Sequence, residues 1–107
     1  MDYYHIWADL KETSQDLEFA ENLEHYLGGL QEQGLIAGYR LARRKLGLGP
    51  EGLGEFHVVI ETENLAQLEQ AFQAVKPRSG ATEEAHHAVY SDVQNARFAL
   101  YRDFPDR

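Results

Sequence analysis

Cysteine is absent from this sequence of 107 residues. Its absence excludes a disulfide framework, a thiolate nucleophile and a zinc–thiolate site. Long apolar runs are missing too, so no segment reaches the roughly 20 residues that a membrane-spanning helix needs. The first residues also lack the basic flank and the apolar run of a secretory signal peptide. We therefore expect one cytoplasmic domain over residues 1–107, with no membrane partner.

Positive charge is in short supply: 10 Lys and Arg residues stand against 18 Asp and Glu residues, which gives a formal net charge of -8. A chain with this excess repels a polyanion, so no nucleic-acid partner is expected. The few cations are clustered, with Arg40, Arg43, Arg44 and Lys45 in one short stretch. A local contact with a small anion therefore stays open.

Polar and apolar side chains alternate along four stretches of the chain, which predicts four β-strands. They are expected at residues 3–10, at 36–46, at 55–62, and from 93 or 95 to 104. The connection between the second and third strands spells Gly-x-Gly-x-x-Gly, but a nucleotide site needs this pattern between a strand and a helix N-terminus. Because both flanks are strands, the pattern predicts a hairpin loop.

Three helices are predicted between these strands. The first runs from 16 to about 34, is capped by Thr13, and has apolar residues at steps of three and four. This stripe consists of Leu17, Ala20, Leu23, Leu27 and Leu30. Asn64 predicts the capped start of a second helix, which Pro77 ends. Thr82 is expected to cap a shorter third helix that runs to about residue 92.

This order of elements predicts an α+β fold, the ferredoxin-like βαββαβ sandwich with an extra short helix before the last strand. Its four-stranded antiparallel sheet carries helices on one face only. The first and third strands are expected to be central neighbours that run parallel to each other. Their helix-facing side chains are suited to a core: Tyr4, Ile6, Ala8, Phe56, Val58 and Ile60.

The face of the sheet opposite the helices, here called the open face, carries aromatic, imidazole and charged side chains. From the first and third strands these are Tyr3, His5, Trp7, Asp9, Glu55, His57, Val59 and Glu61. If this face met water, its aromatic residues would form an apolar patch that soluble monomers usually avoid. We therefore expect a second copy of the chain to cover it and to leave a hollow in between.

Three segments carry a resemblance: Tyr-Tyr-His-Ile-Trp-Ala-Asp-Leu at 3–10, Arg-Arg-Lys-Leu-Gly-Leu-Gly-Pro at 43–50 and Arg-Phe-Ala-Leu-Tyr-Arg-Asp-Phe-Pro at 97–105. The whole chain resembles the dimeric α/β-barrel superfamily of ferredoxin-like proteins, and a small uncharacterised bacterial family within it. The resemblance implies a homodimer that packs sheet against sheet, with a cavity between each sheet and its helices or partner. Its members include cofactor-independent monooxygenases, lactone isomerases, haem-degrading enzymes and stress-responsive proteins.

His5 and His57 are the most informative pair of side chains on the open face. Adjacent strands lie about 4.8 Å apart, so two histidines at similar heights can touch or share a ligand. One interpretation is acid–base catalysis, with Asp9 or Glu61 orienting an imidazole whose pKa lies near neutrality. A second is a metal site completed by a third donor, and a third is a simple hydrogen bond within a polar dimer interface.

Other candidates surround this pair. Trp7, Tyr3 and Tyr101 form either a platform for a planar ligand or the filling of a dimer interface. His86 and Tyr90, four residues apart on the third helix, form either a lid over the open face or an exposed surface.

Three arginines complete the set. Arg97, with Arg40 and Arg44, either clamps an anion or pairs across the strands with Glu55 and Glu61.

These residues locate a site without naming a reaction. One expectation is an enzyme that oxidises or isomerises a small organic compound without a cofactor. Another is a non-catalytic dimer that binds a ligand or responds to stress, and a third is a dimer whose open face is wholly consumed by the partner. No cofactor and no resident metal are expected.

Overall fold

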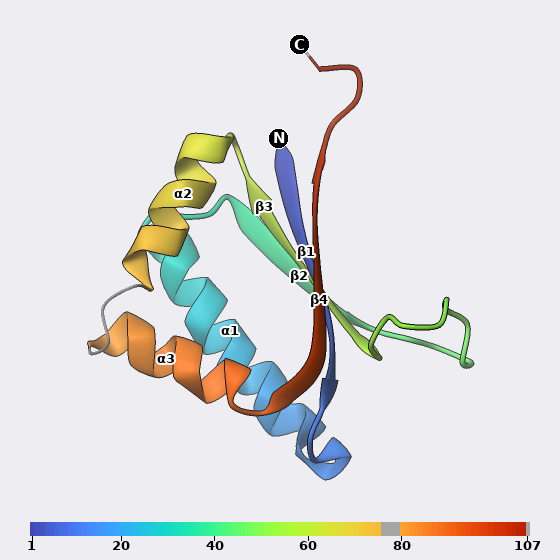
Figure 1. The fold of residues 1–107 in the computed structure, drawn as a ribbon. Coiled ribbons are helices and arrows are strands. Elements are labelled where there is room, and N and C mark those ends of the chain that lie inside the picture. The colour runs from blue at the N-terminus through green and yellow to red at the C-terminus, as the bar shows by residue number, and fades with distance from the viewer. Residues whose placement is uncertain (76–79, 107) are drawn as a thin grey trace.

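Within the part of the chain that the structure describes, four strands form one antiparallel sheet in the order β2-β3-β1-β4, and helices cover one of its faces (Figure 1). The structure is a computed structural model that describes residues 1–75 and 80–106. The strands are β1 (Asp2–Leu10), β2 (Gly38–Arg43), β3 (Phe56–Thr62) and β4 (Val93–Arg102). The helices are η1 (Thr13–Gln15), α1 (Asp16–Glu32), α2 (Leu65–Ala74) and α3 (Ala81–Tyr90). The predicted α+β, ferredoxin-like fold is confirmed.

β1 and β3 are the central neighbours, as expected, but they run antiparallel, so the expectation of a parallel pair is wrong. α1 crosses over the sheet between β1 and β2, which makes these two strands parallel to each other. β2 and β3 follow each other directly and pair antiparallel, so β3 must oppose β1. In the resulting register Tyr3 faces Glu61, and Trp7 faces His57.

The core lies between the sheet and the helices and rests on one face of α1. The buried residues of that face are Phe19, Leu23, Leu27 and Leu30. Each contributes about 1.5–3 kcal/mol by leaving water. The predicted stripe was rotated at its start, because Leu17 is 77% exposed whereas Phe19 is only 2% exposed. Side chains two positions apart on an α-helix point about 200° away from each other. A helix that buries Phe19 must therefore turn Leu17 to solvent.

The predicted cap of α2 is confirmed, because the Asn64 side chain accepts a hydrogen bond at 2.8 Å from the backbone N–H three residues on. The two other predicted caps are wrong. Thr13 lies in η1, whose backbone turn leads directly into α1 without a side-chain cap. α3 starts after Gly80, whose φ of 111° favours glycine, so Thr82 is already helical. Pro77, expected to end α2, lies outside the described residues.

Element ends otherwise differ from expectation by a few residues. α1 ends at Glu32, and Gly34 follows it with a left-handed φ of 74°. β4 ends at Arg102, so Phe104 lies in the tail beyond the sheet rather than on a sheet face. None of the helices in residues 1–75 and 80–106 is both long and apolar enough to span a membrane.

β4 contains an irregularity beside the end of β1. Trp7 faces Arg97 whereas Asp9 faces Gln94, so β4 has one residue more than β1 between these two pairs. Asn95 has a φ of 58° at this point. Its side-chain amide donates a hydrogen bond of 3.3 Å to Asp9 Oδ2. This bulge bends β4 at the edge where the open face carries its charged groups.

Candidate functional site

Three nearly parallel rings lie side by side on the open face. Trp7 and His57 face each other across β1 and β3, with ring centroids 4.7 Å apart and planes 4° apart. His5 lies two residues before Trp7 on the same side of β1. Its centroid is 5.4 Å from that of Trp7 and 5.1 Å from that of His57. Strand alternation thus brings these residues together as predicted, and we call them the imidazole–indole cluster.

The two histidines of this cluster are hydrogen-bonded. His5 Nδ1 lies 2.9 Å from His57 Nε2, so one of these nitrogens carries the shared proton. Burial lowers the pKa of His5, and burial together with the charge of His5 lowers the pKa of His57. Both imidazoles are therefore neutral at pH 7, the form in which one of them can accept a proton.

The two carboxylates that were expected to orient the histidines, Asp9 and Glu61, lie beside other groups. Asp9 Oδ1 accepts a hydrogen bond of 2.9 Å from the Glu55 backbone N–H, and Asp9 Oδ2 accepts from Asn95. Glu61 faces Tyr3 in the register. Among the described residues neither Asp9 nor Glu61 is hydrogen-bonded to a histidine. No group of three or more His, Cys, Asp or Glu residues is placed to hold a metal ion in that same part of the chain.

The two tyrosines expected beside the cluster lie at its rim. The Tyr101 ring meets the His5 ring edge-on, with centroids 5.0 Å apart and planes at 74°. Tyr101 is 60% exposed, which leaves its ring free to contact a ligand or a partner. The Tyr3 hydroxyl donates a 2.7 Å hydrogen bond to Asp103 Oδ1, and this bond raises the pKa of Tyr3.

The structure shows no ion pair of Arg40, Arg44 or Arg97 with Glu55 or Glu61 among the residues that it describes. The neighbouring arginine, which points to the other face, makes the ion pairs instead. Arg43 bonds to both Asp16 and Glu55 at 3.0 Å. Arg44 instead donates to the backbone carbonyls of Leu53 and Gly54. The alternation of β2 turns Arg43 toward the helices, where α1 supplies Asp16.

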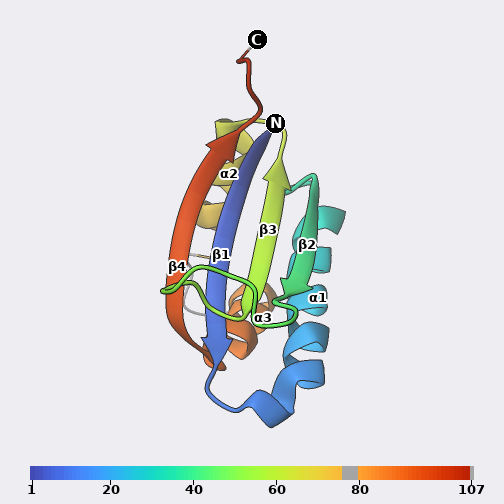
Figure 2. The ribbon, with the colours of Figure 1, turned by 90° about the vertical axis from the view of Figure 1, so that its right-hand side faces the viewer.

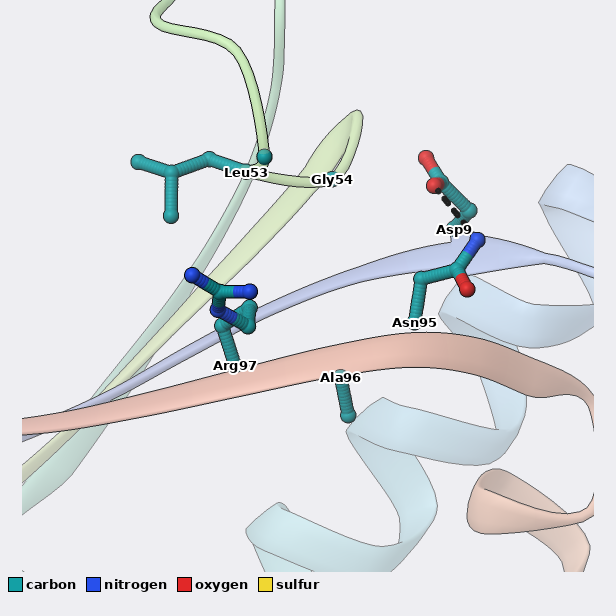
Figure 3. A pocket seen from close by; sticks show the side chains of 7 residues that line it. Asp9, Leu53, Gly54, Asn95, Ala96 and Arg97 are labelled. Carbon is teal, nitrogen blue, oxygen red and sulfur yellow. Dashed lines mark hydrogen bonds between the residues drawn. The ribbon is translucent and has the colours of Figure 1, made fainter.

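Arg97 borders a polar pocket at the edge of the open face (Figure 3). The pocket has a volume of about 460 Å³ and lies between β4, the end of β1 and the β2–β3 connection. Its Arg97 guanidinium lies on the side of Leu53, while Asp9 and Asn95 bond to each other on the opposite side (Figure 3). Asp9 thus places a negative charge in the pocket, which weakens the predicted use of Arg97 as an anion clamp.

A second hollow lies on the other side of the sheet, between the sheet and the helices. Its volume is about 250 Å³. Rings from all the surrounding elements line it: Tyr4, Phe19, Tyr26, Phe56, Phe72, His86, Tyr90 and Phe98. An apolar cavity of about 150 Å³ already holds benzene, so this one has room for a compound of one or two rings.

α3 places His86 and Tyr90 at this cavity, so the expected lid over the open face is wrong. The helix packs against α1 on the covered side of the sheet. The His86 ring lies 5.2 Å from the Tyr26 ring and 4.7 Å from the Tyr90 ring, between centroids. His87 is exposed, because successive helical residues point about 100° apart. Only the first histidine of the pair therefore reaches the interior.

The resemblance implied a cavity between the sheet and its helices or partner, but the residues themselves did not indicate this one, because those that line it look like ordinary core positions. Tyr4 lies on the apolar side of β1, and burial raises the pKa of its hydroxyl. Tyr26 lies on α1 and packs, partly buried, against the core. The available signal was that both of these semi-buried aromatics carry a hydroxyl group, which a purely apolar core does not need.

The family comparison covers the whole chain. The model of a family of unknown function, DUF6614, matches residues 1–107. No curated protein matches the sequence.

Solved structures share the fold at low sequence identity. A dimeric ferredoxin-like protein of unknown function from Jannaschia sp. CCS1 is 12% identical, with a TM-score of 0.70 over 95% of this chain and 98% of that chain. An antibiotic biosynthesis monooxygenase is 13% identical, with a TM-score of 0.63 over 98% and 100%. The heme-degrader MhuD from Mycobacterium tuberculosis, with two hemes bound in its active site, is 16% identical, with a TM-score of 0.58 over 100% and 99%. These likenesses show the ferredoxin-like fold.

Proposed function

The chain belongs to the family of unknown function DUF6614, and we propose that it acts as a homodimer that binds a small ring-bearing organic compound. The apolar cavity between the sheet and the helices carries this proposal. Ligand sites in proteins are typically concave and mostly apolar, with a few polar groups that set orientation. The cavity has this composition, because hydroxyls and one imidazole interrupt an otherwise apolar lining.

The ligand has an apolar body and one polar group. The aromatic walls favour a flat ring system, which stacks or packs edge-on against them. His86, with Tyr26 and Tyr90 beside it, brings polar side chains together at one place in the lining. A phenol or an enol matches both features. Its hydroxyl can give a proton to the imidazole, which leaves a phenolate or an enolate. Return of the proton to a carbon atom of this anion isomerises the compound, whereas its oxidation uses dioxygen as the electron acceptor.

The dimer part of the proposal rests on the open face. No helix in the part of the chain that the structure describes covers this face (Figure 2), on which Trp7, His5 and His57 are half-buried and Tyr101 is 60% exposed. Aromatic residues of this kind are enriched in protein interfaces. The solved structure from Jannaschia is dimeric and has the same fold, which supports the proposal.

Thermal unfolding with two matched compounds tests the ligand. We expect naphthalene and 1-naphthol each to raise the melting temperature, because a compound that binds only the native chain stabilises it. His86→Phe keeps an aromatic ring but removes the imidazole. It should weaken 1-naphthol binding roughly tenfold and leave naphthalene binding unchanged, since only the hydroxyl loses its partner. His87→Phe, at the exposed neighbouring position, is the control and should change neither affinity.

Failure is equally clear in this experiment. If neither compound raises the melting temperature, the cavity does not bind ligands of this class. If both variants weaken 1-naphthol equally, His86 has no special part in binding.

A second candidate places acid–base chemistry in a hollow between two open faces. The 2.9 Å contact between His5 and His57 favours it, as does the lowered pKa that keeps both histidines neutral at pH 7. Asp9 and Glu61 would then act on the histidines only through an intervening group. Trp7, Tyr3, Tyr101 and Arg97 would contact the ligand.

The single Trp residue separates the two candidates. Its indole N–H gives one nuclear magnetic resonance signal, which reports only on the open face. A ligand in the cavity leaves this signal in place while it raises the melting temperature. A ligand on the open face shifts the signal, and His57→Gln then reduces the shift. A ligand that raises the melting temperature without moving the indole signal argues against the second candidate.

A further inference from the structure

The connection between β2 and β3, residues 44–55, stands out from the open face, away from the helices (Figure 1). We call it the arm. Seen toward the open face, the arm crosses in front of the strands near one end of the sheet (Figure 2). It lines two hollows there, one with Trp7 and His57 and the other with Arg97. The arm does not cross the opposite end of the face (Figure 2), where the register places Tyr3, Tyr101 and Glu61, and we call it the bare end.

Hydrogen bonds hold the two ends of the arm together where it leaves the sheet. Its first residue, Arg44, donates from the backbone to the Glu55 carbonyl at 2.8 Å and from the side chain to the carbonyls of Leu53 and Gly54. Gly54 also lies directly against the backbone of Ala8, where any side chain would collide with the Ala8 carbonyl. A segment held in this way keeps its shape when it meets a partner.

The tip of the arm presents two leucines to solvent. Leu46 is 90% exposed and Leu48 is 76% exposed. Leu46 also has a φ of 57°, in the left-handed region that residues other than glycine and asparagine rarely adopt. A leucine has no advantage at such a position in a lone chain, because it is both strained and surrounded by water.

We propose that the arm of each chain lies across the bare end of the open face of a second copy, with Leu46 and Leu48 packed on its Tyr3 and Tyr101. This inference rests on the proposed homodimer and names the residues that hold it together. A two-fold axis brings each arm to the half of the partner that has none, so the same contact forms twice. Lys45 on the arm then meets a face whose Glu61 has no cation bonded to it among the described residues.

The size of the face supports a role for the arm. Four strands of about eight residues cover roughly 500 Å² of flat area. Side chains that project from the sheet add to this flat area. However, part of the face is already covered by the arm of its own chain. A standard interface buries about 800 Å² on each partner. Exchange of the arms raises the buried area toward that value.

Sedimentation equilibrium of a double variant, Leu46→Asn with Leu48→Ser, tests the proposal. Asparagine tolerates the left-handed conformation, so the lone chain keeps its fold, which circular dichroism checks. We expect the dimer dissociation constant to rise roughly tenfold or more. The control is Leu17→Ser, because Leu17 is 77% exposed on α1, on the other side of the sheet. It should leave the constant unchanged.

Cross-linking tests the position of the arm independently. Because the chain has no cysteine, an introduced pair gives an unambiguous disulfide. A mixture of Leu48→Cys chains and Tyr101→Cys chains should form the mixed disulfide on mild oxidation, whereas Leu48→Cys with Leu17→Cys chains should not.

The outcomes separate this inference from the function on which it rests. A wild-type chain that sediments as a monomer overturns the proposed homodimer and the arm contact together. A wild-type dimer whose dissociation constant is the same in the double variant overturns the arm contact alone. A dimer that cross-links equally well through Leu17 also overturns it.

Discussion

On the covered face of the sheet β1 and β3 present Ala8, Phe56 and Val58, each 5% exposed. On the open face the same two strands present His5, Trp7 and His57, all half-buried and in ring contact with one another. The first set leaves water by packing against helices of its own chain. The second set is only half-buried in the single chain and becomes fully buried only if another molecule covers it.

This difference shows how one strand can serve two purposes. Because successive side chains point to opposite faces, stability and recognition occupy separate residues of β1 and β3. Substitutions on the two faces should therefore have different consequences. Those on the covered face should unfold the single chain, and those on the open face should alter its response to pH or to a partner.

The largest effect is expected in the core of the covered face. Leu27 is 1% exposed, so Leu27→Ala should lower the free energy of unfolding by about 2–5 kcal/mol through lost burial and the cavity that remains. Leu17→Ala, in the same helix but 77% exposed, should change it by less than about 0.5 kcal/mol. Urea denaturation measures both, and equal losses would contradict the assignment of the core.

A smaller effect is expected where the arm meets β1. A methyl group at position 54 would lie 2.6 Å from the Ala8 carbonyl oxygen, so Gly54→Ala forces two backbones apart. We expect a loss of about 1–3 kcal/mol in the free energy of unfolding.

Gly29 in α1 is the matched control for Gly54, because an added methyl group meets nothing within 4 Å there. Gly29→Ala should raise the free energy of unfolding by about 0.5–1 kcal/mol, since alanine favours the helix. If Gly54→Ala were as well tolerated as this control, the close approach of the arm to β1 would be disproved.

The smallest effect concerns the pH response of the open face. The pKa values of His5 and His57 are lowered in the folded chain, so below about pH 6.5 the unfolded chain binds more protons than the folded chain. Their contribution is complete above about pH 6.5 and is lost as the pH falls through the lowered values. We expect the melting temperature to drop as the pH falls from neutral to about pH 5.

The variant His5→Gln with His57→Gln should flatten this part of the melting curve against pH. His87→Gln removes an exposed imidazole and should leave it unchanged. A drop that survives in the double variant would assign the pH response to other groups.

The residues alone predicted much of the open face, but only the resemblance implied a cavity beside the helices. Residues 3, 5, 7 and 9 alternate with apolar residues, which is enough to place His5 and Trp7 on one side of β1. The 2.9 Å contact with His57 additionally required the register of β3. Only the packed structure shows that Arg43 rather than Arg44 pairs with Glu55, because α1 draws Arg43 to its side with Asp16. The roles of the site residues stay predictions until they are tested.

The sequence by itself determined the order of strands and helices, the side of β1 on which each residue lies, and the absence of cysteine chemistry. These are properties of neighbouring residues, and periodicity expresses them directly. The tertiary structure decided that β1 and β3 run antiparallel, that His86 and not His87 faces the interior, and that the arm overhangs one end of the open face. These depend on how segments distant in the chain cross, and on the volume that their side chains leave unfilled.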